Sequence, residues 1–338
     1  MVRLMRSSYC KQKNLTKYKR RMKKIIYSLA VLALLFTDTS CNSNDDGGQQ
    51  EIKIPGITFD GDVECCSADE AVQIYQFLQT VKIIPELTTV VDGQYTVSVY
   101  NSTGTLHTGY NDLYFIANKV ASGNYIKEFS VSGISPVMLM TKMNMKHSTP
   151  ISGGVKSFNS GFTAVKHGWI SFVMPTSESG YWTIGYDANV LGRKGSLAAT
   201  EINVEALPAG QEWIKSFKSG DNTYYLSLVN PTSFVTGKND IQAYVSVKSH
   251  VATNPYELAS DEFVIDIDPR MPDMGNHTSP DNSALKRSTD GSYRGTINLT
   301  MTGLWRIHLT VKDLQGNIVA GGDNLKDGFS SLFWDVTL

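Results

Sequence analysis

The sequence predicts an all-β protein: two tandem immunoglobulin-like β-sandwich domains, preceded by a signal peptide, a flexible tether and one short helix. Three observations lead to this class. The 338 residues are rich in strand- and turn-forming types, with 16 Tyr and 28 Gly alongside many Val, Thr and Ser. Short strand-like runs alternate with turns of Gly, Asn, Asp and Pro from residue 87 onward. One half of this region also repeats the other, which indicates a duplicated domain.

The first 40 residues are predicted to be a signal peptide with a basic N-terminal extension. Residues 1–24 contain ten Lys and Arg and no acidic residue, and an apolar run follows from Ile25 to Phe36. This run has the length of a signal-peptide core and is too short to span a bilayer, which takes about 20 residues. Removal of residues 1–40 leaves 21 basic and 31 acidic residues. Because an acidic protein repels a phosphate backbone, we expect no nucleic-acid partner.

A cysteine follows the apolar run. Thr39-Ser40-Cys41 resembles the cleavage site of bacterial lipoproteins, in which the cysteine is lipidated, and a plain secretory signal is the alternative. Residues 41–62 would then be the lipidated Cys41 and a polar tether, whose acidic residues resemble the surface-export signal of Bacteroidota lipoproteins. We therefore expect an extracytoplasmic outer-membrane lipoprotein, periplasmic or surface-exposed, held to the lipid membrane by an N-terminal acyl anchor. Cys65 and Cys66 are adjacent, and no disulfide framework is expected.

Residues 63–86 are predicted to form a short helical segment. Ser67 and Glu70 have the spacing of a capping box, and apolar residues recur at helical spacing as far as Val81. The pattern predicts a helix over 68–82 that ends before Pro85.

The rest of the chain divides into a first β-sandwich at 87–207 and a second at 208–338. Similar segments recur in the same order, 123–130 residues apart: 99–112 and 228–240, 147–150 and 277–280, 168–174 and 295–301, and 180–184 and 303–307. Each copy holds about seven strand-like runs, which suits an immunoglobulin-like sandwich.

One strand of the second copy shows clear alternation. We expect one set to face the core, namely Trp305, Ile307, Leu309 and Val311. We expect the other set to face outward, namely Leu304, Arg306, His308 and Thr310.

The methionines beyond the leader gather in equivalent parts of the two copies. They are Met138, Met140, Met143, Met145 and Met174 in the first copy, and Met271, Met274 and Met301 in the second. A histidine follows each cluster, His147 or His277. Thioether sulfur is a soft donor and neutral imidazole a borderline one, so the combination favours Cu(I) over Zn²⁺, Mg²⁺ or Ca²⁺.

The predicted copper ligands are Met271, Met274, His277, Met301 and His308 in the second copy, and Met143, Met145, His147 and Met174 in the first. The Thr302-Gly303 turn would let Met301 and His308 approach the same ion. The alternative is packing, because Met138 and Met140 alternate with Val137 and Leu139 as strand residues do. Adaptable methionines can also form a partner-binding patch.

The second copy resembles a known kind of domain. Residues 269–280, which contain Met271, Met274 and His277, precede Gly291–Gly295 and Thr300–His308. This arrangement is similar to the YtkA-like and FixH-like families of small extracytoplasmic β-sandwich domains, with a proline-Met-Gly-His type loop and a Met-x-Gly-x-Trp hairpin. The resemblance is clearer over residues 265–315 and weaker over 130–190. FixH-like proteins are associated with assembly of copper-dependent oxidases, so the resemblance implies copper as the bound ion and an oxidase or efflux protein as partner.

Motifs of common enzymes are missing from the sequence. We find no nucleophile elbow, no phosphate-binding glycine loop and no His-Glu-x-x-His motif. We therefore predict a lipoprotein, not an enzyme, that binds or delivers copper through Met/His loops. The alternative is a surface-exposed immunoglobulin-like interaction or adhesion module with no metal.

Overall fold

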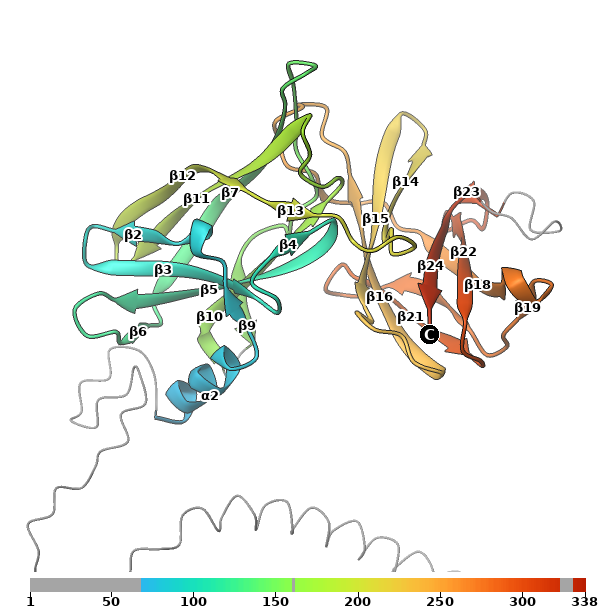
Figure 1. Cartoon of the computed structure of the whole chain (residues 1–338), viewed down its shortest axis with the longest axis horizontal. Coiled ribbons are helices and arrows are strands. Elements are labelled where there is room, and N and C mark those ends of the chain that lie inside the picture. Colours follow the sequence, from blue (N-terminus) through green and yellow to red (C-terminus); the bar gives the residue numbers. More distant parts are fainter. Residues whose placement is uncertain (1–67, 160–161, 323–330) are drawn as a thin grey trace, which may run out of the picture. The chain divides into compact units, whose positions relative to one another are not determined.

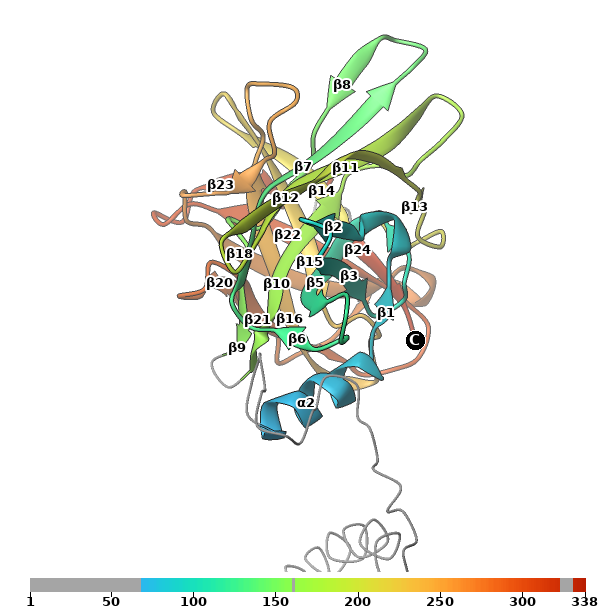
Figure 2. The ribbon, with the colours of Figure 1, turned by 90° about the vertical axis from the view of Figure 1, so that its left-hand side faces the viewer.

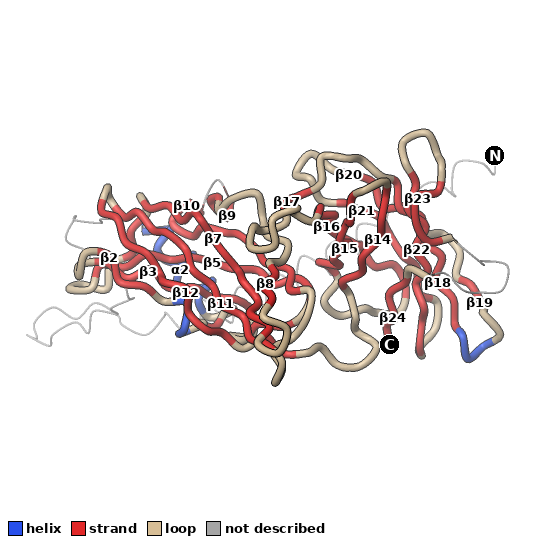
Figure 3. Tube along the Cα trace, turned by 90° about the horizontal axis from the view of Figure 1, so that it is seen from above, coloured by secondary structure: helices blue, strands red, loops and turns tan. Residues whose placement is uncertain are grey.

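The computed structural model describes residues 68–159, 162–322 and 331–338 (Figure 1). The predicted signal peptide, Cys41, the tether and Cys65–Cys66 lie outside these residues. Strands dominate the described chain (Figure 3), and the prediction of an all-β protein with tandem β-sandwiches behind one short helix is confirmed. Within the described ranges, the helices are too short or too polar to cross a membrane.

The helix α2 (Ala68–Leu78) is shorter than predicted. The chain turns after Leu78, and β1 (Lys82–Ile83) pairs with β3 (Tyr95–Asn101). The predicted end at residue 82 is wrong because the backbone groups of Lys82 and Ile83 bond to a neighbouring strand instead of continuing the helix.

The helix buries its apolar stripe against the first sandwich. Ala71 and Ile74 are fully buried, and Ile74 packs in a small cluster with Ile116 and Val165, apart from the main core. Because Ile116 belongs to β5 and Val165 to β10, the helix covers this part of the sheet.

The first sandwich consists of two main sheets. One contains, in spatial order, β1 (Lys82–Ile83), β3 (Tyr95–Asn101), β5 (Gly109–Lys119), β10 (Phe162–Phe172) and β9 (Lys156–Asn159), with β2 (Thr89–Val91) on β3 and β6 (Tyr125–Ile126) on β5. The other contains β12 (Arg193–Ile202), β11 (Gly180–Val190), β7 (Phe129–Met140) and β8 (Met145–His147). A short 3₁₀ helix, η1 (Pro85–Leu87), precedes β2, and a parallel pair joins β13 (Val204–Glu205) to β4 (Leu106–His107).

The second sandwich is one continuous sheet that wraps around its core. Its order is β14 (Ile214–Ser219), β15 (Asn222–Asn230), β16 (Gly237–Val247), β21 (Tyr293–Leu299), β20 (Ser283–Arg287), β18 (Val264–Met271), β22 (Leu304–Lys312) and β23 (Ile318–Gly321). Side branches are β17 (Glu257–Leu258) on β16, β19 (His277–Thr278) on β18 and β24 (Phe333–Thr337) on β22. A 3₁₀ helix, η2 (Pro272–Met274), lies between β18 and β19.

Each sandwich has its own hydrophobic core. The first contains Trp182, whose ring centroid lies 5.0 Å from that of Phe172, and the second contains Trp305 and Trp334. All three tryptophans and Phe172 are fully buried. Since burying an aromatic side chain contributes on the order of 2–3 kcal/mol, these rings are major sources of stability.

The alternation predicted for β22 is right for the core set and wrong for half of the outer set. Trp305, Ile307, Leu309 and Val311 are fully buried, as expected. His308 and Thr310 are also buried, with His308 only 1% exposed. The reason is that β22 lies between β18 on one side and β23 and β24 on the other. His308 lies between Asp268 and Phe333, and Thr310 lies between Asp266 and Gly321.

The repeat seen in the sequence has a counterpart in hydrogen bonding. The Asn111 amide donates to the carbonyls of His107 and Gly109 and accepts from the His107 N–H. Asn239 makes the same three bonds with Val235 and Gly237. Both asparagines are buried, so the two copies share a turn held by one amide.

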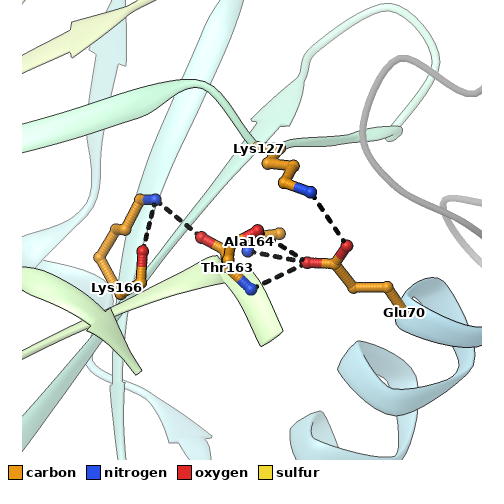
Figure 4. A network of polar contacts seen from close by, with 6 residues as sticks. Glu70, Lys127, Thr163, Ala164 and Lys166 are labelled. Carbon is orange, nitrogen blue, oxygen red and sulfur yellow. Dashed lines mark hydrogen bonds and ion pairs between the residues drawn. The ribbon is translucent and has the colours of Figure 1, made fainter. Parts of the chain in front are cut away.

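The Glu70 carboxylate joins the helix to the first sandwich (Figure 4). It accepts hydrogen bonds from the Thr163 N–H at 2.9 Å and the Ala164 N–H at 3.2 Å, and an ion pair links it to Lys127 at 3.4 Å. Burial by itself raises the pKa of Glu70, but the bonds from Ala164 and Thr163 and the charge of Lys127 outweigh it and hold the pKa below its usual value. Glu70 therefore makes long-range contacts that a capping-box role did not predict.

Replacing Glu70 with alanine should lower the free energy of unfolding by about 1.5–3 kcal/mol at neutral pH, because charge-assisted bonds to a buried carboxylate are lost. The folded-state pKa lies below the unfolded one, so this stabilisation exists above the ordinary carboxyl pKa and disappears as pH falls through the lowered value. Urea unfolding at about pH 7 and pH 3 measures both effects. A Glu70→Ala deficit that is equally large at both pH values would contradict the account.

Candidate functional site

Three of the four predicted ligands of the first sandwich, Met143, Met145 and His147, lie on a hairpin formed by β7 and β8, which extends beyond the neighbouring strands (Figure 2). The fourth, Met174, follows β10. Across this hairpin Met138 pairs with His147, and Met140 pairs with Met145. Directly opposite residues on antiparallel strands share a face, with Cβ atoms about 4.5–5.5 Å apart, and residues two apart on one strand also share it. The hairpin register therefore places three thioethers and one imidazole on a single face.

The same face continues onto β11. Trp182 pairs with Met138, and Gly180 pairs with Met140. The site therefore has two rows across three strands: an inner row of His147, Met138 and Trp182, and an outer row of Met145, Met140 and Gly180. We call this arrangement the hairpin ladder.

The ladder runs from the core to solvent. Met138 is 2% exposed and belongs to the hydrophobic core, Met140 is half-buried, and Met145 is 46% exposed. A Cβ added to Gly180 would lie 2.8 Å from the Leu139 carbonyl oxygen and 3.1 Å from Cε of Met138. Glycine at this position is therefore needed for the close approach of β11 to the methionines.

The second sandwich repeats the inner row. Met271 pairs with His277 across β18 and β19, and the ring centroid of His277 lies 6.4 Å from that of Trp305. A Cβ on Gly303 would come within 2.9 Å of Cε of Met271, just as one on Gly180 would approach Met138. A buried methionine, a cross-strand histidine, a tryptophan and a glycine thus recur in both sandwiches.

The two tryptophans are held in the same way. The indole N–H of Trp182 donates to the Met174 carbonyl at 2.9 Å, and that of Trp305 donates to the Met301 carbonyl at 2.9 Å. The side chains of Met174 and Met301 are half-buried and pack against the respective cores. The carbonyl groups of Met174 and Met301 thus hold the tryptophan rings in place, while their side chains lie at the edge of each core.

Like Met174 and Met301, two more predicted ligands lie outside the paired rows. Met143 lies in the turn between β7 and β8 and is 55% exposed, and Met274 lies in η2 and is 54% exposed. Neither has a cross-strand partner among the described pairs. Their exposure makes them accessible, but strand pairing does not direct them toward the histidines.

His308 lies away from Met271 and His277. It pairs with Asp268 on β18, and Asp268 and Met271, three residues apart, point to opposite faces of that strand. His308 therefore does not approach Met271 and His277 as expected. The turn at Gly303 comes before β22 and does not change which side chains of that strand face each side of the sheet.

Sequence reasoning missed Met138, Met140, Trp182 and Trp305 as members of the site. Met138 and Met140 were counted in the methionine cluster but not among the predicted ligands, with strand packing as the alternative. Trp305 was predicted to face the core, and Trp182 was treated only as part of a recurring segment. The sequence did hold one indication of these residues. Met138-x-Met140 and Met145-x-His147 lie on either side of a short turn, and in the observed hairpin register this spacing places all four side chains on one face.

The donor set at both clusters is restricted to sulfur and imidazole. No group of three or more His, Cys, Asp or Glu residues suited to a metal ion occurs in the described part of the chain. A site at these positions would therefore suit a soft ion better than Zn²⁺, Mg²⁺ or Ca²⁺.

These features define a class: a tandem β-sandwich protein in which each sandwich carries a Met–His–Trp cluster at one end. Residues 218–310 match the YtkA-like family model. This segment lies within the second sandwich, so the predicted resemblance of that sandwich to YtkA-like domains is confirmed.

Comparison with solved structures finds distant similarities. Dimeric latent PorU from Porphyromonas gingivalis is 12% identical, with a TM-score of 0.19, and the aligned region covers 77% of this chain and 24% of PorU. The C-terminal domain of the Streptococcus agalactiae AgI/II polypeptide BspA is 9% identical, with a TM-score of 0.12 and coverage of 76% and 99%. No curated protein matches the chain.

Proposed function

We propose that this protein is an extracytoplasmic lipoprotein that binds copper as Cu(I) and delivers it to a partner. One observation carries the proposal: the same Met–His cross-strand pair stands beside a buried tryptophan in both sandwiches, as Met138–His147 and Met271–His277. Packing alone requires no histidine opposite the methionine, and the pair occurs twice.

The donor chemistry fits a cuprous ion. Thioethers are soft and uncharged, and neutral imidazole completes such a set without adding negative charge. Met138 and His147 would hold the ion in the first sandwich, and Met271 and His277 in the second. Bound copper would supply a transferable soft cation, close to Trp182 in the first sandwich and Trp305 in the second.

Export and anchoring complete the proposal. Acylation of Cys41 would hold the sandwiches at the outer membrane on the polar tether of residues 41–62, where an exported oxidase or an efflux protein that uses copper would be the recipient. The role proposed is binding and transfer, without catalysis.

A Cu(I) titration against a chromogenic cuprous chelator tests this function. Thiolates also bind Cu(I), so the full chain should carry serine in place of its four cysteines, Cys10, Cys41, Cys65 and Cys66. We expect two equivalents of Cu(I), one of them lost in a Met138→Leu/His147→Gln variant and the other in Met271→Leu/His277→Gln.

Matched controls keep the result specific. Leucine replaces methionine at nearly constant volume, so the cores should stay folded. His107→Gln and His250→Gln remove histidines outside the clusters and should leave both equivalents in place. Failure of the parent protein to compete with the chelator, or full binding by the two pair variants combined, would refute copper binding.

A second candidate function is an interaction or adhesion module without metal. Burial favours it, since Met138 and Met271 are 2% and 3% exposed and lie within the hydrophobic cores. Under this alternative the Met→Leu variants keep full stability, and added Cu(I) leaves the thermal midpoint unchanged. A bound ion would instead raise the midpoint with its concentration.

A further inference from the structure

We propose that the two cuprous sites are unequal, and that the hairpin ladder of the first sandwich is the tighter site. Its four donors are Met138, Met140, Met145 and His147, and the first equivalent of Cu(I) binds there. This inference rests on the proposed function and extends it by assigning the donors and the order of filling.

The hairpin ladder places four soft donors on one face. The inner row of the ladder supplies Met138 and His147, and the outer row supplies Met140 and Met145 directly beside them. Methionine has three rotatable side-chain bonds, so sulfurs on adjacent cross-strand pairs can turn toward one ion without backbone change. The hairpin itself holds all four donors within ten residues of chain.

The second sandwich has no thioethers at the positions that correspond to the outer row. Two residues beyond Met271, where the ladder has Met140, stands Asp273, and two residues before His277, where it has Met145, stands Gly275. The Met271–His277 pair thus has no thioether at either outer position. Met274 occupies η2 between them and is 54% exposed, so strand pairing does not fix it on the site's face.

Strand β11 supports the hairpin ladder differently at its two rows. Gly180 pairs with Met140 in the outer row and leaves no side chain there, while Trp182 closes the inner row. The indole N–H of Trp182 is engaged by the Met174 carbonyl, so the ring is fixed in orientation. The ladder therefore has a rigid inner end and an open outer end at Met145.

These differences predict an order of affinity. Each thioether adds a soft donor to the same ion, whereas the second sandwich offers one paired methionine and one histidine. We expect the hairpin ladder to retain copper when the Met271–His277 site has released it.

Methionine methyl NMR provides a site-resolved test. The full chain with its four cysteines replaced by serine is labelled at the methionine Cε and titrated with Cu(I) under anaerobic conditions. During the first equivalent we expect shifts for Met138, Met140 and Met145, and during the second for Met271. Simultaneous shifts in both sandwiches, or Met271 shifting first, would overturn the proposed order.

The outer row is tested by a Met140→Leu/Met145→Leu variant, with Met143→Leu as the matched control on the same hairpin. We expect the double variant to lose affinity for the first equivalent by at least roughly tenfold, the lower end of what disturbing a metal site costs. The control should bind like the parent, because Met143 lies in the turn outside both rows.

The outcomes separate the two proposals. Absence of any methyl shift or chelator competition contradicts copper binding as a whole. Two equal sites, or an outer-row variant that binds like the parent, contradicts the hairpin ladder alone and leaves copper binding by the Met–His pairs in place.

Discussion

Replacing Trp305 with alanine should lower the free energy of unfolding of the second sandwich by about 3–5 kcal/mol, the range for large-to-small changes in a packed core. Trp305 is fully buried in that core, and its indole N–H holds the Met301 carbonyl. The variant loses both the ring contacts and the bond that ties the loop before β22. Urea unfolding followed by circular dichroism measures the loss without relying on tryptophan fluorescence.

Two comparisons check the explanation. Trp305→Phe keeps an aromatic ring and removes the N–H, so it should recover most of the stability and leave a deficit of about 1–2 kcal/mol. Trp182→Ala should have a similar effect in the first sandwich, because Trp182 has the same burial and the same bond to Met174. A loss below about 1 kcal/mol in either alanine variant would show that the tryptophan is not central to its core.

Replacing His308 with leucine should stabilise the protein by about 1–3 kcal/mol, because the native imidazole is desolvated without compensation. Both ring nitrogens are buried, and neither has a hydrogen-bond partner in the described structure. Leucine has a similar volume and no polar atoms to satisfy. Urea unfolding at about pH 7.5 measures this difference.

The same variant should flatten the pH dependence of stability. Burial lowers the pKa of His308, the charge of Asp268 opposes this, and Arg270 and Arg306 add to it. The unfolded chain therefore takes up a proton near the ordinary value of 6.5 while the folded chain does not, so stability falls as pH drops below that value. The slope is at most about 1.4 kcal/mol per pH unit for one group. An unchanged slope in His308→Leu would assign the titration to another residue.

The periodicity of the sequence was sufficient for the general architecture. Strand-like runs, turn residues and the recurring segments predicted two sandwiches, and the alternation of Trp305, Ile307, Leu309 and Val311 correctly identified one core face. It could not predict that His308 would be buried, because alternation assigns a residue to a face but does not show which strands cover that face. The helix end at Leu78 was also missed, since Lys82 and Ile83 bond to a strand about 20 residues away.

The candidate site, too, could be predicted from the sequence only in part. Composition and spacing located the methionines and histidines and indicated a soft ion. They did not indicate which side chains meet, so Met143, Met274 and His308 were included and Met138 and Met140 were left out. Register decides this, because a shift of one residue across a hairpin moves every side chain to the other face.

The sequence by itself determined the all-β class, the duplication and the chemical character of the donors, because these follow from local periodicity and residue type. Only the tertiary structure decided that His147 lies opposite Met138, that His277 lies opposite Met271, and that a tryptophan lies beside each pair. The physical reason is that pairing between strands is set by turn geometry and by burial of the whole sheet, which no single segment of the chain specifies.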